Sequence, residues 1–265
     1  MKIQGSLLKM ISANNNPIDY YLALEKEKIH LNKLIGKQIK LTYLGSINCI
    51  KCGRKTNKSF HQGFCYPCFM TAPETSECIL KPELCRAHEG ISRDMEWSNE
   101  HCLQDHFVYL AISSGLKVGV TRKSQIPTRW IDQGATWALK IAQTPNRYLA
   151  GIIEVDLKKF FDDKTNWRNM LINKIDVNTD LLVQRNRAYE LIKKDYKQYF
   201  LMNEEITELH YPVTEYPTKV NSIDLEKAIT TENTLIGIKG QYLIFDTGNV
   251  INLRKYGGYR VEIEY

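Results

Sequence analysis

All seven cysteines of this 265-residue chain lie between residues 49 and 102. In a reducing cytosol disulfides do not persist, and an odd, clustered set of thiols is typical of metal ligands. The surrounding stretch, residues 49–106, lacks long apolar periodicity and is rich in Cys, His and Gly. Because a bound metal can replace a hydrophobic core in such a stretch, we expect residues 49–106 to fold around zinc.

Two Cys-x-x-Cys pairs, separated by twelve residues, begin this region. Each pair places two thiolates on one turn, and two such turns supply four tetrahedral ligands to one zinc ion. A redox-active pair is the alternative, but no β-α-β pattern flanks these cysteines. The spacing therefore predicts a structural zinc held by Cys49, Cys52, Cys65 and Cys68.

The remaining cysteines predict a second zinc site. Cys85-x-x-His88 again suits one turn, and Cys102 follows just before the next predicted strand. His101 and His106 compete with Cys102 for the last position. In the alternative interpretation the cysteines are buried thiols and His88 is a hydrogen-bonded loop residue. We predict as ligands Cys78, Cys85, His88 and Cys102.

The chain is mildly basic, with a net charge of +6, which permits a nucleic-acid partner without requiring one. Between Cys49 and Cys68 there are four positive side chains and no carboxylate, and aromatic residues lie among them. Such a surface can contact phosphates and base planes, although a solvated basic loop would have the same composition. The candidate nucleic-acid contacts are Lys51, Arg54, Lys55, Lys58 and Arg122.

The sequence as a whole predicts an α+β fold with four segments, of which the zinc region is one. Residues 1–48 form an N-terminal β segment of two or three strands, and residues 171–265 hold a helix over 180–201 followed by β-strands. Neither terminal segment has enough alternating apolar residues for a stable sheet alone. We therefore expect the terminal strands to pack together.

The fourth segment, residues 107–170, follows the zinc region. Strands are predicted over 107–112 and 116–121, joined as a hairpin by Ser113-Ser114-Gly115. A short helix over 128–132, a strand over 137–143 and a helix over 147–161 follow. The apolar stripe of the last helix is Ala150, Ile153, Leu157 and Phe160.

This segment resembles the GIY-YIG nuclease module of phage homing endonucleases and of the incision nuclease of nucleotide-excision repair. The resemblance lies in Val108-Tyr109-Leu110, a turn, Lys117-Val118-Gly119-Val120-Thr121, and an arginine on the next helix. Gly151-Ile152-Ile153-Glu154 falls where the family has its metal-binding glutamate, and Asn166 where an asparagine closes the module. Two departures are Lys117, in place of the second tyrosine, and Arg129, about two residues later than usual.

The resemblance implies hydrolysis of a phosphodiester by a divalent-metal-dependent endonuclease. Glu154 would hold Mg²⁺ or Mn²⁺, Tyr109 would help activate water, and Arg129 would stabilise charge on phosphorus. Lys117 would steer phosphate or lower the pKa of Tyr109. The alternatives are a core tyrosine, an Arg129–Asp132 pair, a solvated glutamate and a turn-capping Asn166.

Nearly the whole chain also resembles an uncharacterised bacterial zinc-finger family known only as a domain of unknown function. Cys-x-x-Cys-Gly-Arg-Lys-Thr, Gly-Phe-Cys-Tyr-Pro-Cys-Phe and Pro-Thr-Arg-Trp-Ile-Asp-Gln-Gly-Ala carry this resemblance. The start lacks a secretory signal and no stretch predicts a membrane helix, so a cytoplasmic location is expected. We predict zinc-ribbon-like knuckles followed by a small GIY-YIG-like module that acts on nucleic acid. The alternative is a catalytically inactive zinc module that binds nucleic acid or protein.

Overall fold

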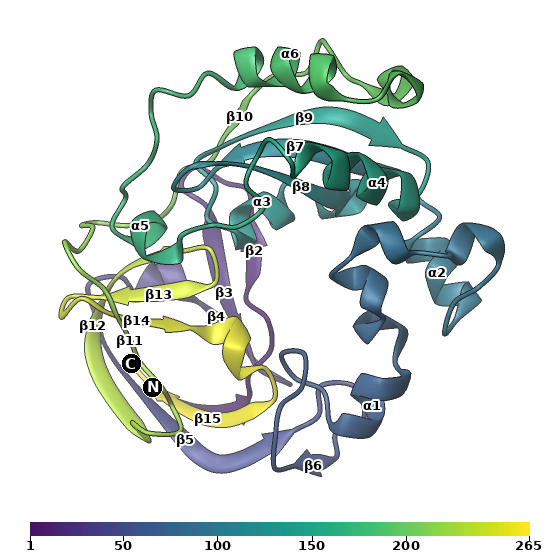
Figure 1. Ribbon diagram of the computed structural model, residues 1–265. Coiled ribbons are helices and arrows are strands. Elements are labelled where there is room, and N and C mark those ends of the chain that lie inside the picture. Colours follow the sequence, from purple (N-terminus) through teal and green to yellow (C-terminus); the bar gives the residue numbers. More distant parts are fainter. The chain divides into compact units, whose positions relative to one another are not determined.

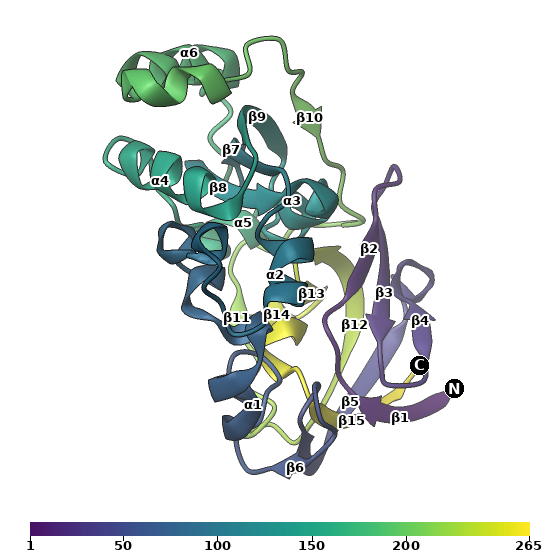
Figure 2. The ribbon, with the colours of Figure 1, turned by 90° about the vertical axis from the view of Figure 1, so that its right-hand side faces the viewer.

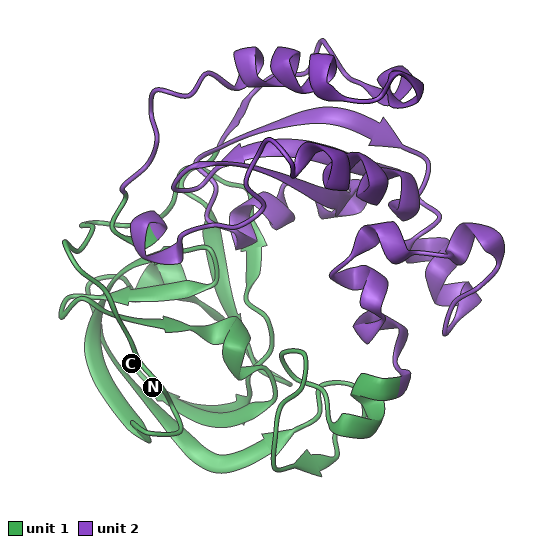
Figure 3. Ribbon diagram, viewed as in Figure 1, with its two compact units in different colours: residues 1–70, 171–173, 209–265 green, residues 71–170, 174–208 purple.

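The structure is a computed structural model that describes residues 1–265, and it has the predicted α+β architecture (Figure 1). The chain forms two compact units (Figure 3). Unit 1 contains residues 1–70, 171–173 and 209–265, and unit 2 contains residues 71–170 and 174–208. The boundary after residue 70 divides the predicted zinc region, and both units take part of residues 171–265. None of the helices has the length and hydropathy needed to cross a bilayer.

The main sheet of unit 1 joins strands from both ends of the chain (Figure 2). Its strand order is β1-β15-β5-β12-β13-β14-β11, and β6 pairs with β5. β1 is antiparallel to β15, with Lys2 opposite Glu264, so the predicted packing of the terminal strands is confirmed. The strands are β1 (Lys2–Ser6), β5 (Gln38–Asn48), β6 (Lys55–Thr56), β11 (Asn221–Ser222), β12 (Thr230–Lys239), β13 (Tyr242–Phe245), β14 (Asn249–Asn252) and β15 (Tyr259–Glu264).

Residues 1–48 form five strands rather than the predicted two or three. β5 follows a period of two, with Ile39 and Leu41 buried between more exposed neighbours, which is why its pattern is clear in the sequence. Three of these strands form a separate antiparallel sheet; two of them have only three residues, and the third has tyrosines on both faces, which hides its alternation in the sequence. They are β2 (Ile11–Ala13), β3 (Asp19–Ala23) and β4 (Lys28–His30).

Unit 2 is built on an antiparallel sheet with the order β10-β9-β7-β8. The predicted hairpin is β7–β8, in which Tyr109 lies opposite Gly119. Every residue of β7 is buried, because this strand has neighbours on both sides and packed elements on both faces. The strands are β7 (His106–Ile112), β8 (Leu116–Arg122), β9 (Trp137–Thr144) and β10 (Thr207–Glu208).

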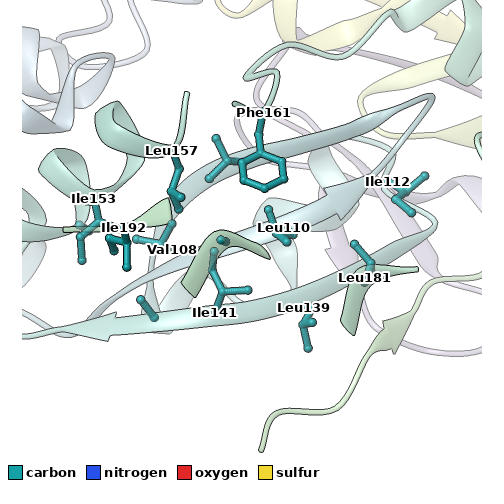
Figure 4. Packing of buried hydrophobic residues seen from close by; sticks show 14 residues of the cluster. Val108, Leu110, Ile112, Leu139, Ile141, Ile153, Leu157, Phe161, Leu181 and Ile192 are labelled. Carbon is teal, nitrogen blue, oxygen red and sulfur yellow. The ribbon is translucent and has the colours of Figure 1, made fainter. Parts of the chain in front are cut away.

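The core of unit 2 lies between this sheet and two helices, α4 (Arg147–Leu157) and α6 (Leu181–Leu191) (Figure 4). Val108, Leu110 and Ile112 alternate along β7 and pack with Ile153 of α4. The same cluster includes Leu139, Ile141, Leu157, Phe161, Leu181 and Ile192.

Two predicted helices are shorter in the structure. The helix predicted over 147–161 ends at Leu157, so the core residue at its end is Phe161, while Phe160 is exposed. The helix predicted over 180–201 ends at Leu191, because Ile192 adopts an extended backbone and its side chain enters the core. A 3₁₀ helix follows over Lys194–Tyr199. The remaining helices are α1 (Tyr66–Thr71), α2 (Met95–His101), α3 (Thr128–Asp132) and α5 (Trp167–Leu171).

Candidate functional site

The four cysteines of the first predicted zinc site come together in unit 1, where their Sγ atoms all lie within 4.8 Å of one another. Cys49 follows the end of β5, and Cys65 precedes α1. Between Cys49 and Cys52 the chain turns, with the Gly53 amide donating to the Cys49 carbonyl at 2.8 Å. Four convergent thiols are the ligand set of a closed, tetrahedral zinc site, so this cluster can bind zinc.

The two turns of this cluster pack tightly against each other. The Ile50 amide donates to the Gly63 carbonyl at 2.9 Å, and a Cβ at Gly63 would lie 2.7 Å from the Ile50 side chain. Burial opposes ionisation of Cys49, but hydrogen bonds from backbone amides, that of Cys65 foremost, outweigh it and lower its pKa to about 6. These backbone amides therefore favour the thiolate form of Cys49, the form that a metal requires.

The predicted nucleic-acid contacts are divided between the two units. Lys51, Arg54, Lys55 and Lys58 are exposed around the first cysteine cluster in unit 1. The Lys58 ammonium lies 5.2 Å from the centre of the Phe60 ring. Arg122 belongs to unit 2, where its Nε donates to the Ser124 hydroxyl at 2.7 Å.

The second cluster lies in unit 2 and contains three cysteines, Cys78, Cys85 and Cys102, whose Sγ atoms also lie within 4.8 Å of one another. Arg147, the first residue of α4, borders it: its guanidinium donates to the carbonyls of Cys78 and His101 at 3.4 and 3.2 Å. Hydrogen bonds from the Cys78 and Cys85 thiols, with the charge of Arg147, lower the pKa of Cys102. Three thiols with a cation beside them can also hold zinc.

No histidine joins this cluster, although three were candidates. The ring of His88, the predicted ligand, stacks on Tyr148 with 4.4 Å between the ring centres. His101 stacks on Trp97, and its Nδ1 is 2.9 Å from the Trp97 carbonyl oxygen. His106 is buried at the start of β7 with Nδ1 2.7 Å from the Gln104 carbonyl. The structure therefore brings together three of the four predicted ligands.

Four of the residues implied by the nuclease resemblance lie on four different elements of unit 2. Tyr109 is on β7, Lys117 on β8, Arg129 on α3 and Glu154 on α4. We call these four residues the polar cluster. Their groups interact electrostatically: the charge of Arg129 acts on Tyr109, Lys117 and Glu154. Residues separated by up to 45 positions in the sequence are thus neighbours.

Tyr109 is completely buried. Its hydroxyl donates to Gln133 Oε1 at 2.9 Å and its ring packs edge-on against Trp130. Gly119 makes room for the ring, since a Cβ there would lie 2.6 Å from the Tyr109 oxygen. Burial raises the pKa of Tyr109, so the resting side chain is a neutral phenol that donates a hydrogen bond.

Lys117 and Glu154 are both buried ionisable groups, exposed by 4% and 7%. Burial, reinforced by the charge of Arg129, lowers the pKa of Lys117 to about 7, and its Nζ donates to the Thr165 hydroxyl at 2.7 Å. Burial raises the pKa of Glu154, although Lys158 lies 3.3 Å from its carboxylate. Opposed shifts in adjacent buried groups are typical of sites that transfer protons or bind charged ligands.

Asn166 lies outside this arrangement. Its side chain is exposed, and its Oδ1 accepts from the Asn169 amide at 3.2 Å at the start of α5, which is the turn-capping alternative. Sequence reasoning missed Gln133, Thr165 and Lys158, which contact the polar cluster, and Arg147 at the second cysteine cluster. Only Lys158 carried a local signal, the helical i,i+4 spacing from Glu154.

One protein family matches most of the chain. Its description is Protein of unknown function (DUF2797), and the match covers residues 36–261. The chain belongs to this family. The DUF2797 match includes both cysteine clusters and the polar cluster. No curated protein and no solved structure matches the chain.

Proposed function

We propose that this protein binds zinc through its cysteine clusters and acts on nucleic acid through the polar cluster, by metal-dependent hydrolysis of a phosphodiester. The observation that carries the proposal is the meeting of Tyr109, Lys117, Arg129 and Glu154 from four elements. The order of those elements, hairpin, helix, strand, helix, is similar to that of the GIY-YIG module.

The chemistry follows from the state of each group. Arg129, the half-buried member, would meet a phosphate first and stabilise charge that develops on it. Glu154 would hold Mg²⁺ or Mn²⁺, which would supply further positive charge. Lys117, with a pKa of about 7, can accept a proton from attacking water near neutral pH, as a general base should.

Tyr109 has a different role from the one implied by the resemblance. Because its pKa is raised, it would remain a neutral phenol, and its one O–H already donates to Gln133. We therefore assign the general base to Lys117, and to Tyr109 the positioning of Gln133 beside the polar cluster.

The test is cleavage of single-stranded, duplex and structured DNA and RNA with Mg²⁺ or Mn²⁺. Glu154→Gln should reduce cleavage by at least about a hundredfold, the usual scale for losing a main electrostatic contributor. Glu190→Gln, an exposed change on α6 of the same unit, is the matched control. Cleavage that survives Glu154→Gln unchanged would eliminate the polar cluster as the site.

A second candidate function is binding of nucleic acid without cleavage. It is favoured by the burial of three of the four members of the polar cluster. In that case wild type should bind nucleic acid, show no cleavage with either metal, and lose affinity on Arg129→Ala.

A further inference from the structure

The second cysteine cluster lines a pocket. The pocket has a volume of about 390 Å³, and all three cysteines contribute to its wall. Leu84, Ile91 and Trp97 form apolar parts of the same wall. None of the three candidate histidines lines it. The face of the cluster that protein ligands leave uncovered therefore opens on a space large enough for a small molecule.

The charge around the cluster suits an anionic ligand. Three thiolates leave a divalent metal with a net charge of −1, and a fourth would make it −2. Arg147 donates to carbonyl groups and to Cys102, not to a carboxylate, so its charge can offset that of the thiolates. Arg86, Arg93 and Glu77 also line the pocket, and Arg86 pairs with Glu89 at 2.8 Å.

We propose that Cys78, Cys85 and Cys102 form an open zinc site whose fourth ligand is an exchangeable small thiol taken from this pocket. Zinc sites with three protein ligands keep the fourth position for water or substrate, whereas structural sites are closed by four. Thiolate ligands favour a further soft donor. The first cluster, with four cysteines, is the closed site in the same chain.

The experiment uses the full chain with Co²⁺ in place of zinc, because the visible absorption of tetrahedral Co²⁺ depends on its ligands. The protein is reduced with a phosphine and titrated with 2-mercaptoethanol, with ethylene glycol as the thiol-free control. We expect the thiol to change the absorption spectrum until the change saturates. Its size should correspond to one of the two bound Co²⁺ ions. The glycol should cause no shift.

Variants assign the response. Cys102→Ser should abolish it while the spectrum of the first cluster remains, and Cys78→Ser serves if Cys102→Ser fails to fold. His88→Ala and His106→Ala should each retain two metal equivalents and the full response. A thiol-insensitive spectrum in wild type, or loss of one metal equivalent from either histidine variant, would overturn the proposal in favour of a closed site.

X-ray absorption at the zinc edge gives an independent readout. Without thiol, the sulfur ligands should average about 3.5 per zinc over one closed and one open site, and with thiol about 4. An average that stays at about 3.5 in saturating thiol also contradicts the proposal.

Discussion

Lys117 should reduce the stability of unit 2 whenever it is protonated. Burial first, and then Arg129, lower its pKa from 10.5 to about 7, against the opposing charges of Asp163 and Glu154. The unfolded chain therefore binds more protons than the folded one between these two values, and stability rises with pH through that window. At about 1.4 kcal/mol per pKa unit, the penalty below pH 7 is on the order of 5 kcal/mol.

Lys117→Met removes the charge and keeps most of the side-chain volume. The variant loses the hydrogen bond to Thr165, which offsets about 1 kcal/mol. We therefore expect its free energy of unfolding to exceed that of wild type by about 4 kcal/mol at pH 6. The difference should shrink as pH rises towards 9, because Lys117 of wild type is then neutral in the folded state.

Tryptophan fluorescence can follow this unit selectively. The four tryptophans, at positions 97, 130, 137 and 167, all belong to unit 2. Urea unfolding of zinc-saturated protein at pH 6, 7.5 and 9 gives the difference at each pH, and Lys164→Met in the exposed neighbouring loop is the control. A Lys117→Met variant that is less stable than wild type at pH 6, or whose difference from wild type does not change with pH, refutes the reasoning.

Three further predictions concern unit 1 and the metals. Protein purified without added metal should contain close to two zinc equivalents, and serine at both positions of the first Cys-x-x-Cys pair should leave one. Metal analysis that finds less than half an equivalent in the wild-type protein contradicts this. Replacing Arg54, Lys55 and Lys58 by alanine should weaken nucleic-acid binding and flatten the slope of log affinity against log salt by about 2 to 3; an unchanged slope would place the contact elsewhere. Deleting residues 235–265 removes β13, β14, β15 and part of β12, and this deletion should make the protein insoluble. A soluble product in which residues 1–48 are still protected from proteolysis would argue against a shared sheet.

The features predicted correctly from the sequence had local signals. The paired Cys-x-x-Cys turns need only a few residues each, and the β7–β8 hairpin combines two apolar runs with a Ser-Ser-Gly turn. α3 lies over the predicted 128–132. The packing of β1 on β15 was predicted from a different argument, that neither terminal segment could form a sheet alone.

The features that escaped prediction depend on contacts distant in sequence. β2 and β4 have three residues each, too few for a period to emerge, and in β3 Tyr20 and Tyr21 place the same residue type on both faces. At the second cluster, local spacing favoured His88, but its ring stacks on Tyr148, sixty residues away. Gln133, which receives the Tyr109 hydrogen bond, is a polar residue at a helix end, and such residues are common without any role.

Helix α4 connects the second cysteine cluster to the polar cluster within unit 2. Its first residue, Arg147, touches the second cysteine cluster, and Glu154 lies about 10 Å further along the same rigid rod. Between them, Gly151 admits the backbone of Pro82 and Glu83, where a Cβ would come within 2.2 Å of the Glu83 nitrogen, and this backbone joins Cys78 to Cys85. A ligand that binds one position of α4 more tightly than another would change the affinity at the far end of the helix, and by linkage the two affinities would change by the same factor.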